Sequence, residues 1–340
     1  MDNSPPSDAG LTKVEGLWFD SDPLVIKAGT RLFRVSPSQL GYHAKAFGDI
    51  LSMPLAADAE TYEGCPLLTL QDDPQEVEMF LRAIYDPSFE PVSGIPCAEI
   101  LRFSHKYDAP SLRRGMLKRL ALLYPTTLTD FDMLGQQLPA PGNARIVAAV
   151  ARECQVLWLV PFATLCWMQA PAENYTADIA SRAELWAARE RYHKLWTRHV
   201  ISIHDADFEV RTHRAFSSMR QTRECISADR SCATSLMRKY SRDMSTRSYD
   251  MLAILEDEPL RGTDSRKLCR NCTRVFLDRF DDVRQQFWDA LPGLYAVEGW
   301  DELEKMKNKD LGKVDAEPAR RVYLPREKPF LALAFLVAHS

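Results

Sequence analysis

The amino-acid sequence predicts an α+β fold, in which a small N-terminal domain of short strands covered by helices precedes a mainly α-helical region. Two observations lead to this prediction. Short alternating apolar runs and amphipathic segments follow one another in the first third of the chain, whereas the later apolar residues recur at helical spacing. With 340 residues, of which 46% are hydrophobic, the chain is long enough for two ordinary domains.

Residues 1–16 are expected to form a flexible leader. Their large apolar residues are only Met1, Leu11 and Val14, and the pair Pro5-Pro6 lies between the first two. Burial of so few side chains cannot offset the backbone entropy that ordering costs, about 1–2 kcal/mol per residue. The start also lacks the basic and apolar regions of a secretory signal, so we expect a cytoplasmic or nuclear protein with reduced cysteines.

Two strands and a helix are predicted next. The runs Leu24–Ile26 and Arg31–Val35 flank a Gly-Thr turn, and the second run alternates apolar and polar residues like a half-buried strand. Ser36 and Pro37 are typical of a helix start, because serine can cap the free amides and proline fits the first turn. The apolar face of this helix is expected to consist of Leu40, Phe47, Ile50 and Leu51.

A loop over 56–64 is expected before a third strand, Leu67–Leu70. Asp73 and Pro74 then start an amphipathic helix, and two further helices are divided at Ala109-Pro110. The helical and strand spacing of the apolar residues predicts a common core made of Leu40, Phe47, Leu70, Phe80, Ile84, Tyr107 and Leu112.

Two short motifs are the most specific part of residues 17–124. One is the helical segment Leu81–Tyr85, and the other is Lys106–Asp108 at the junction of two helices. Together with the order of the strands and helices, these motifs resemble a BTB/POZ domain of the type abundant in mushroom-forming fungi. The sequence departs from the family pattern at Ser36 and Ala44, where the family usually has His and Ser.

This resemblance implies a non-enzymatic protein that associates with other proteins, including copies of itself, through shape and apolar complementarity. The alternative is a substrate adaptor for a cullin-type ubiquitin ligase. Many such adaptors carry a bulky apolar residue two positions before a glutamate, in the loop after the first helix pair. Here Asp58 stands two positions before Glu60, which weakens the alternative.

The region 125–309 is predicted to be mainly α-helical. Helices are expected on either side of Pro161 and over 180–200. The clearest helix is Leu268–Leu291, because its apolar residues step by three or four until Pro292-Gly293 stops it.

The remaining residues, 310–340, form a C-terminal tail with an apolar end, Phe330–Ala338. Nine apolar residues can form a buried strand or helix, or a peripheral anchor, but they are too short to cross a membrane. A second unusual segment, 211–247, contains nine Lys or Arg and three Asp or Glu. Its low hydrophobicity favours an exposed linker, and contact with phosphate or an acidic partner stays open.

No catalytic or cofactor-binding motif is present in the sequence, whether a glycine-rich phosphate loop, a zinc protease motif or a nucleophile elbow. We therefore expect no catalytic residues, no cofactor and no small-molecule substrate. The chain has 43 Lys and Arg against 47 Asp and Glu, a net charge of −4, which gives it no general attraction to nucleic acid or anionic lipid. The expected partners are other proteins.

Cys269 and Cys272 form the one motif that could bind a metal. Zinc would need two more ligands, and the nearest pair is Cys225 and Cys232. On a helix those two residues lie about 10.5 Å apart along the axis, too far for one ion. Cys272 also falls on the apolar stripe of its helix, so core cysteines are favoured and no bound metal is expected.

Overall fold

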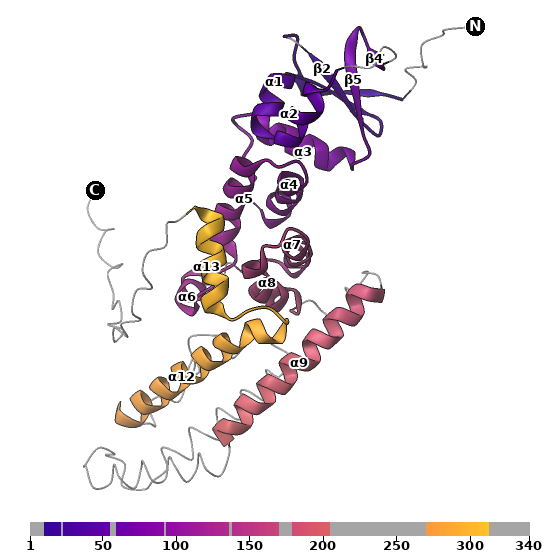
Figure 1. The fold of residues 1–340 in the computed structure, drawn as a ribbon. Coiled ribbons are helices and arrows are strands. Elements are labelled where there is room, and N and C mark those ends of the chain that lie inside the picture. The colour runs from indigo at the N-terminus through magenta and orange to yellow at the C-terminus, as the bar shows by residue number, and fades with distance from the viewer. Residues whose placement is uncertain are drawn as a thin grey trace, which may run out of the picture.

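The computed structural model describes residues 10–21, 23–54, 59–91, 93–135, 138–169, 179–204 and 270–312. The described chain runs from a sheet at one end of the molecule, through packed shorter helices, to two long helices at the other end (Figure 1). Among the described helices, none is both long and apolar enough to cross a membrane. The combination of one mixed sheet with many helices confirms the α+β class.

The sheet has five strands in the order β1-β3-β2-β5-β4. Their bounds are β1 Thr12–Trp18, β2 Leu24–Ala28, β3 Arg31–Val35, β4 Thr61–Tyr62 and β5 Cys65–Leu70. Strand β2 pairs antiparallel with β3 and parallel with β5, so that Ile26 lies opposite both Phe33 and Leu68. The three predicted strands are confirmed, and β4 is a short strand inside the segment that was expected to be a loop.

Strand β1 corrects the prediction of a flexible leader over 1–16, because residues 12–16 belong to it. β1 pairs in parallel with β3, and the Thr12 amide donates a hydrogen bond to the Thr30 carbonyl (2.8 Å). Val14 and Leu17 are buried against the same core as the helices. The neighbouring strand supplies hydrogen bonds and buried area that the leader lacks when it is considered alone.

Lys13 connects the two edges of the sheet. Its Nζ lies 2.6 Å from Oε1 of Glu63, although β1 and β4 stand at opposite ends of the strand order. The same ammonium lies 4.7 Å from the ring centroid of Trp18 and 5.8 Å from that of Tyr62. The sheet is therefore strongly curved, with one face closing over a small apolar cluster that contains Val25, Leu32 and Cys65.

Helices cover the other face of the sheet. They are α1 Pro37–His43, α2 Lys45–Ser52, α3 Pro74–Tyr85, α4 Gly94–Lys106 and α5 Pro110–Leu123. The single helix expected after Ser36 is two helices, because Ala44 between them is extended (φ −132°, ψ 105°). Ser36 precedes α1 without a capping hydrogen bond from its side chain, whereas the Asp73 carboxylate accepts from two amides of α3 as predicted.

Aromatic side chains dominate the core between the sheet and α1–α5. The rings of Phe47 and Tyr107 stack with centroids 4.4 Å apart, and Phe80 and Phe103 pack beside them. The predicted core is confirmed, since all seven of its residues belong to this cluster or pack against it: Leu40, Phe47, Leu70, Phe80, Ile84, Tyr107 and Leu112.

The rest of the described chain is helical, as expected. Its elements are α6 Leu128–Leu134, α7 Pro141–Glu153, η1 Leu157–Leu159, α8 Val160–Trp167, α9 Ile179–His204, α12 Arg270–Leu294 and α13 Trp300–Leu311. Pro161 does not separate two helices but sits in the first turn of α8, where a missing amide hydrogen costs nothing. Pro292 lies inside α12, which continues to Leu294, so the predicted stop is three residues early.

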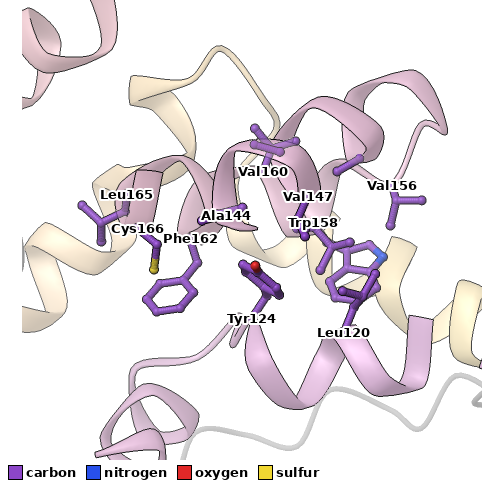
Figure 2. Packing of buried hydrophobic residues seen from close by; sticks show 14 of the residues in the cluster. Leu120, Tyr124, Ala144, Val147, Val156, Trp158, Val160, Phe162, Leu165 and Cys166 are labelled. Carbon is purple, nitrogen blue, oxygen red and sulfur yellow. The ribbon is translucent and has the colours of Figure 1, made fainter. Parts of the chain in front are cut away.

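A second apolar core fills the helical region and reaches back into the N-terminal part. Leu120 and Tyr124 at the end of α5 pack among side chains of α7 and α8 (Figure 2). Helix α4 contributes Ile100 and Leu101 to this core, whereas its Phe103 and the next residue after the helix, Tyr107, belong to the core beside the sheet. The predicted border between 17–124 and 125–309 therefore runs through a shared core.

Helix α13 returns to lie beside α5 (Figure 1). The Trp158 indole donates a hydrogen bond to Oδ2 of Asp310 (2.9 Å), and the Trp300 indole donates to the Trp288 carbonyl (2.7 Å). The rings of Trp288 and Trp300 stack with centroids 5.3 Å apart. Buried indole groups with satisfied N–H donors fix α12 and α13 on the earlier helices.

Candidate interaction surface

The cysteines considered as metal ligands lie outside the part of the chain with described side chains. Cys225, Cys232 and Cys269 are not among the described residues, and only the backbone of Cys272 is described, inside α12. Within the described ranges, no three His, Cys, Asp or Glu residues gather as metal ligands would. The expectation of core cysteines at these four positions stays a prediction.

The described thiols are all buried. They belong to Cys65, Cys97, Cys154 and Cys166. Loss of solvation raises the pKa of Cys97 and of Cys154 to about 11, and it also raises the pKa of Cys166. At neutral pH the thiols of Cys97, Cys154 and Cys166 are therefore protonated, and a protonated buried thiol is a poor nucleophile.

The acidic pair at the start of α3 has a structural role. Tyr107 donates its hydroxyl hydrogen to Oδ2 of Asp72 (2.5 Å), and Lys106 forms an ion pair with the same carboxylate. Asp73 caps α3 through hydrogen bonds from the amides of Gln75 and Glu76. Both carboxylates are thus occupied in joining α3 to the end of α4.

Three exposed apolar side chains lie on the helices α1 and α2 and on the residue directly after α2. Tyr42 is 84% exposed, Met53 is 64% exposed and Ile50 is 40% exposed. We call these three residues the α1–α2 patch. Ile50 corrects the sequence analysis, which placed it on the buried face with Phe47: both residues lie in α2, but Ile50 is turned about 60° around the helix axis from Phe47 and stands at the exposed edge of the apolar face.

The two helices that carry the patch touch at Gly41 and Gly48. A Cβ atom on Gly41 would lie 3.0 Å from the Cα of Gly48, which is tighter than nine in ten real contacts of this kind. Tyr42 follows the first glycine directly and Ile50 lies two residues after the second, so the patch flanks the point where the helices cross.

Backbone hydrogen bonds fix α2 to the junction of α4 and α5. The amide of Lys45 donates to the carbonyl of Asp108 (3.1 Å), and the amide of Ala46 donates to the carbonyl of Tyr107 (3.2 Å). These bonds satisfy amides at the start of α2 that its own helix leaves free. The patch therefore stands on a rigid support and not on a loop.

The other large exposed apolar side chains among the described residues are dispersed. Leu122 lies on α5, Met133 on α6, Trp186 on α9 and Phe19 just after β1. Single exposed apolar residues of this kind are normal on protein surfaces.

The loop that bears on the cullin alternative follows α2. Residues 55–58 lie outside the described chain, so the structure does not place Asp58. Glu60 is exposed, and its carbonyl accepts a hydrogen bond from the Leu67 amide (2.9 Å). The departure from the adaptor pattern at Asp58 remains a statement about sequence.

Comparison with known proteins adds no relative. No protein-family model matches the chain, and no match is found among curated proteins. The resemblance to BTB/POZ domains therefore stays a prediction that rests on the residues quoted for it.

Proposed function

We propose that this protein is a non-enzymatic interaction protein that binds another protein through the α1–α2 patch. The observation that carries the proposal is the exposure of Tyr42, Ile50 and Met53 on two short helices whose neighbouring apolar residues are buried. The resemblance of residues 17–124 to a BTB/POZ domain agrees with such a role.

The chemistry of the patch supports association with an apolar surface. Tyrosine and methionine are enriched at protein interfaces, and burying one large apolar side chain contributes about 1.5–3 kcal/mol. Exposed apolar groups that a rigid support holds in place lose little conformational entropy on binding. The binding energy would come from these anchors, and polar groups around them would select the partner.

The protonated state of three buried thiols supports binding over a reaction that depends on them. Cys97, Cys154 and Cys166 lie inside the cores and not at the patch. A nucleophile needs a lowered pKa and an accessible position, and these thiols have neither.

The proposal is tested by affinity purification of the tagged full chain from cells, followed by mass spectrometry. The variant Ile50→Glu/Met53→Glu places charge in the patch and should lose the main partner. The control variant Met133→Glu changes another exposed apolar residue, on α6, and should keep the partner. Thermal melts of both variants verify that they are folded.

Recovery of the same partners with Ile50→Glu/Met53→Glu as with the unchanged chain would overturn the proposal. A cullin among the proteins lost by that variant would support the adaptor alternative. A tagged chain that captures an untagged copy of itself, and loses it in the same variant, would identify self-association as the activity. Point variants suit this test better than a truncation at residue 125, since that cut would expose Leu120 and Tyr124 of the shared core.

A further inference from the structure

Among the described residues, which exclude the segments 211–247 and 330–338, a small cation site lies on the outer face of the sheet. The Nζ of Lys13 lies 4.7 Å from the ring centroid of Trp18 and 5.8 Å from that of Tyr62. Both distances fall within the roughly 6 Å over which an aromatic ring attracts a cation. The same nitrogen lies 2.6 Å from Oε1 of Glu63. We call Trp18, Tyr62 and Glu63 the cation cage.

The walls of the cage come from the two edges of the curved sheet. Trp18 ends β1 and Tyr62 ends β4, and both rings are partly buried against the apolar cluster of this face. The sheet therefore fixes the positions of the two rings. The side chains of Lys13 and Glu63 are 45% and 46% exposed, so the cage is open to solvent.

The backbone at Glu63 is strained. Tyr62 pairs with Cys65, so Glu63 and Gly64 form a two-residue turn between β4 and β5, with φ of 48° and 79°. Two-residue turns with positive φ at both positions favour Asn, Asp and Gly, and a glutamate is unusual there. Backbone strain of this kind is concentrated at binding sites, and here it places a carboxylate against an ammonium group.

The charges around the cage favour a cation. The guanidinium carbon of Arg34 lies 5.8 Å from the ring centroid of Trp18, but Arg34 has its own ion-pair partner in Asp20 (3.3 Å). The carboxylate of Glu63 is thus left to balance the charge of a cation that lies between the two rings. Glu63 also accepts a hydrogen bond, so it favours a cation that keeps an N–H group.

Dimethyllysine meets these requirements better than lysine itself. Methylation keeps the positive charge of the side chain, and its methyl groups replace hydrated N–H groups with apolar surface that contacts the ring faces. Dimethyllysine retains one N–H group, which Glu63 can accept, whereas trimethyllysine retains none. Lys13 shows that a lysine carried by an extended strand can place its ammonium in the cage.

We propose that the cation cage binds a dimethyllysine side chain of a partner protein, and that Lys13 is the resident competitor that this side chain displaces. The inference does not depend on the α1–α2 patch, because α1 and α2 cover the opposite face of the sheet. It adds a second contact site with a different chemistry.

The test begins with Lys13→Ser in the full chain, which removes the resident ammonium. The probe is Nα-acetyl-Nε-dimethyllysine methylamide, and its binding is followed by NMR titration of the Trp18 indole N–H resonance. Lys13→Ser should bind the probe about tenfold more tightly than the unchanged chain, because a tethered competitor is gone. Lys45→Ser removes another exposed lysine, on α2, and should bind the probe as the unchanged chain does.

The walls of the cage are tested in the same background. Lys13→Ser/Tyr62→Leu removes one ring face and should bind the probe about fivefold more weakly than Lys13→Ser. The trimethyl form of the probe should also bind Lys13→Ser about fivefold more weakly than the dimethyl form, since it has no hydrogen to donate to Glu63.

A measurement on the unchanged chain keeps the test decisive if Lys13→Ser does not fold. An N-hydroxysuccinimide ester of acetic acid acetylates exposed lysines, and peptide mass spectrometry gives the rate at each position. Saturating probe should displace Lys13 and raise its rate of acetylation about tenfold. The rate at Lys45 should stay the same.

A folded Lys13→Ser that binds no probe, or that binds it no better than Lys45→Ser, would overturn the inference. An unchanged acetylation rate at Lys13 under saturating probe would overturn it as well. Tighter binding of the trimethyl form would also overturn it, in favour of a quaternary ammonium such as the headgroup of a choline lipid. Failure of the inference is separate from failure of the proposed function, because none of these measurements involves the α1–α2 patch.

Discussion

Two buried tyrosines differ in what their hydroxyl groups contact. The Tyr107 hydroxyl donates to Oδ2 of Asp72 at 2.5 Å. The Tyr124 hydroxyl is buried, and among the described residues it has no hydrogen-bond partner. It lies close to α4, since a Cβ atom on Gly94 would be 3.2 Å from it. A buried hydroxyl without a partner costs free energy, whereas a bonded one contributes it.

Replacement of each tyrosine by phenylalanine should therefore act in opposite directions. Tyr124→Phe should leave the free energy of unfolding unchanged or raise it by about 1–2 kcal/mol, because it removes an unsatisfied polar group. Tyr107→Phe should lower it by about 1–2 kcal/mol, because Asp72 loses a donor. Denaturant unfolding of the full chain measures both, and a clear loss of stability in Tyr124→Phe would contradict the prediction.

The buried thiols predict how stability changes at alkaline pH. In the folded chain the pKa of Cys97 and of Cys154 is raised from 9.0 to about 11 by loss of solvation. The unfolded chain releases these protons at lower pH, so unfolding releases protons and becomes easier as pH rises. The contribution to stability is complete below pH 9 and is lost between about pH 9 and 11.

The melting temperature should accordingly fall as pH rises from about 9 to 11, and the fall should be shallower in Cys97→Ala/Cys154→Ala. Lysines and tyrosines elsewhere titrate alike in the variant and in the unchanged chain. The difference between the two slopes therefore reports mainly on Cys97 and Cys154. Identical slopes in the variant and the unchanged chain would contradict the assignment of these thiols.

Single residues were predictable from sequence where local chemistry decides their role. Asp73 before Pro74 is such a case, since a carboxylate next to free helix amides can cap them whatever surrounds it. Ile50 was not predictable in this way. An apolar residue three positions from Phe47 fits a buried helix face, and whether the edge of that face is covered depends on the elements that pack beside α2.

At the scale of elements, the close crossing of α1 and α2 depends on two glycines. Gly41 and Gly48 allow the two backbones to approach so closely that a Cβ atom on Gly41 would lie 3.0 Å from the Cα of Gly48. Glycine normally weakens a helix, so its presence in both helices trades helix propensity for close packing.

Gly41→Ala should lower the free energy of unfolding by about 1–3 kcal/mol, because the added methyl group meets backbone that cannot move aside. Gly115→Ala is the control, since nothing lies within 4 Å of the added Cβ in α5. That variant should be neutral or stabilising by up to about 1 kcal/mol through helix propensity. Equal losses in the two variants, measured by denaturant unfolding, would show that packing at the crossing is not the cause.

Elements were predictable where their own apolar pattern is strong. Strand β3 and helices α3, α4 and α5 follow from spacing alone. Strand β1 was missed because its buried residues, Val14 and Leu17, stand three apart across an irregular register that includes Gly16 at φ 80°. Strand β1 is held in place by its pairing with β3, and the residue pattern within β1 cannot reveal which strand it pairs with.

The whole molecule is tied together by helices that belong to two cores. Phe103 of α4 and Tyr107 directly after it pack beside the sheet, while Ile100 and Leu101 of the same helix pack among α5, α7 and α8. Because α4 packs in both cores, the unfolding of one core removes contacts from the other, and the two cores should unfold together.

Calorimetry of the full chain should therefore show the described part unfolding in a single transition. Phe47→Ala removes a stacked ring from the core beside the sheet, and it should lower the free energy of unfolding by about 3–5 kcal/mol and shift this whole transition. Two transitions, of which only one moves in Phe47→Ala, would show that the cores unfold independently.

The sequence therefore predicted the fold class and the N-terminal core, but it placed the border between domains where the structure has continuous packing. Spacing identifies which face of a helix is apolar but not which helix lies opposite. Tyr124 illustrates the limit, since its neighbours on α7 and α8 follow it by twenty residues or more. The candidate surface was beyond prediction for the same reason, because exposure is decided by how α1 and α2 cross.

The docking of α13 on the earlier helices has a consequence for how the protein is made. The Asp310 carboxylate accepts a hydrogen bond from the Trp158 indole. Its Oδ1 also lies 3.5 Å from Nη2 of Arg113, a residue almost two hundred positions earlier in the chain. A ribosome adds about 5–20 residues per second, so α5 waits roughly 10–40 s after its own synthesis before α13 exists to cover it. During this interval the side of α5 that α13 covers stays open, so this contact completes only after residues 124–299 have been synthesised.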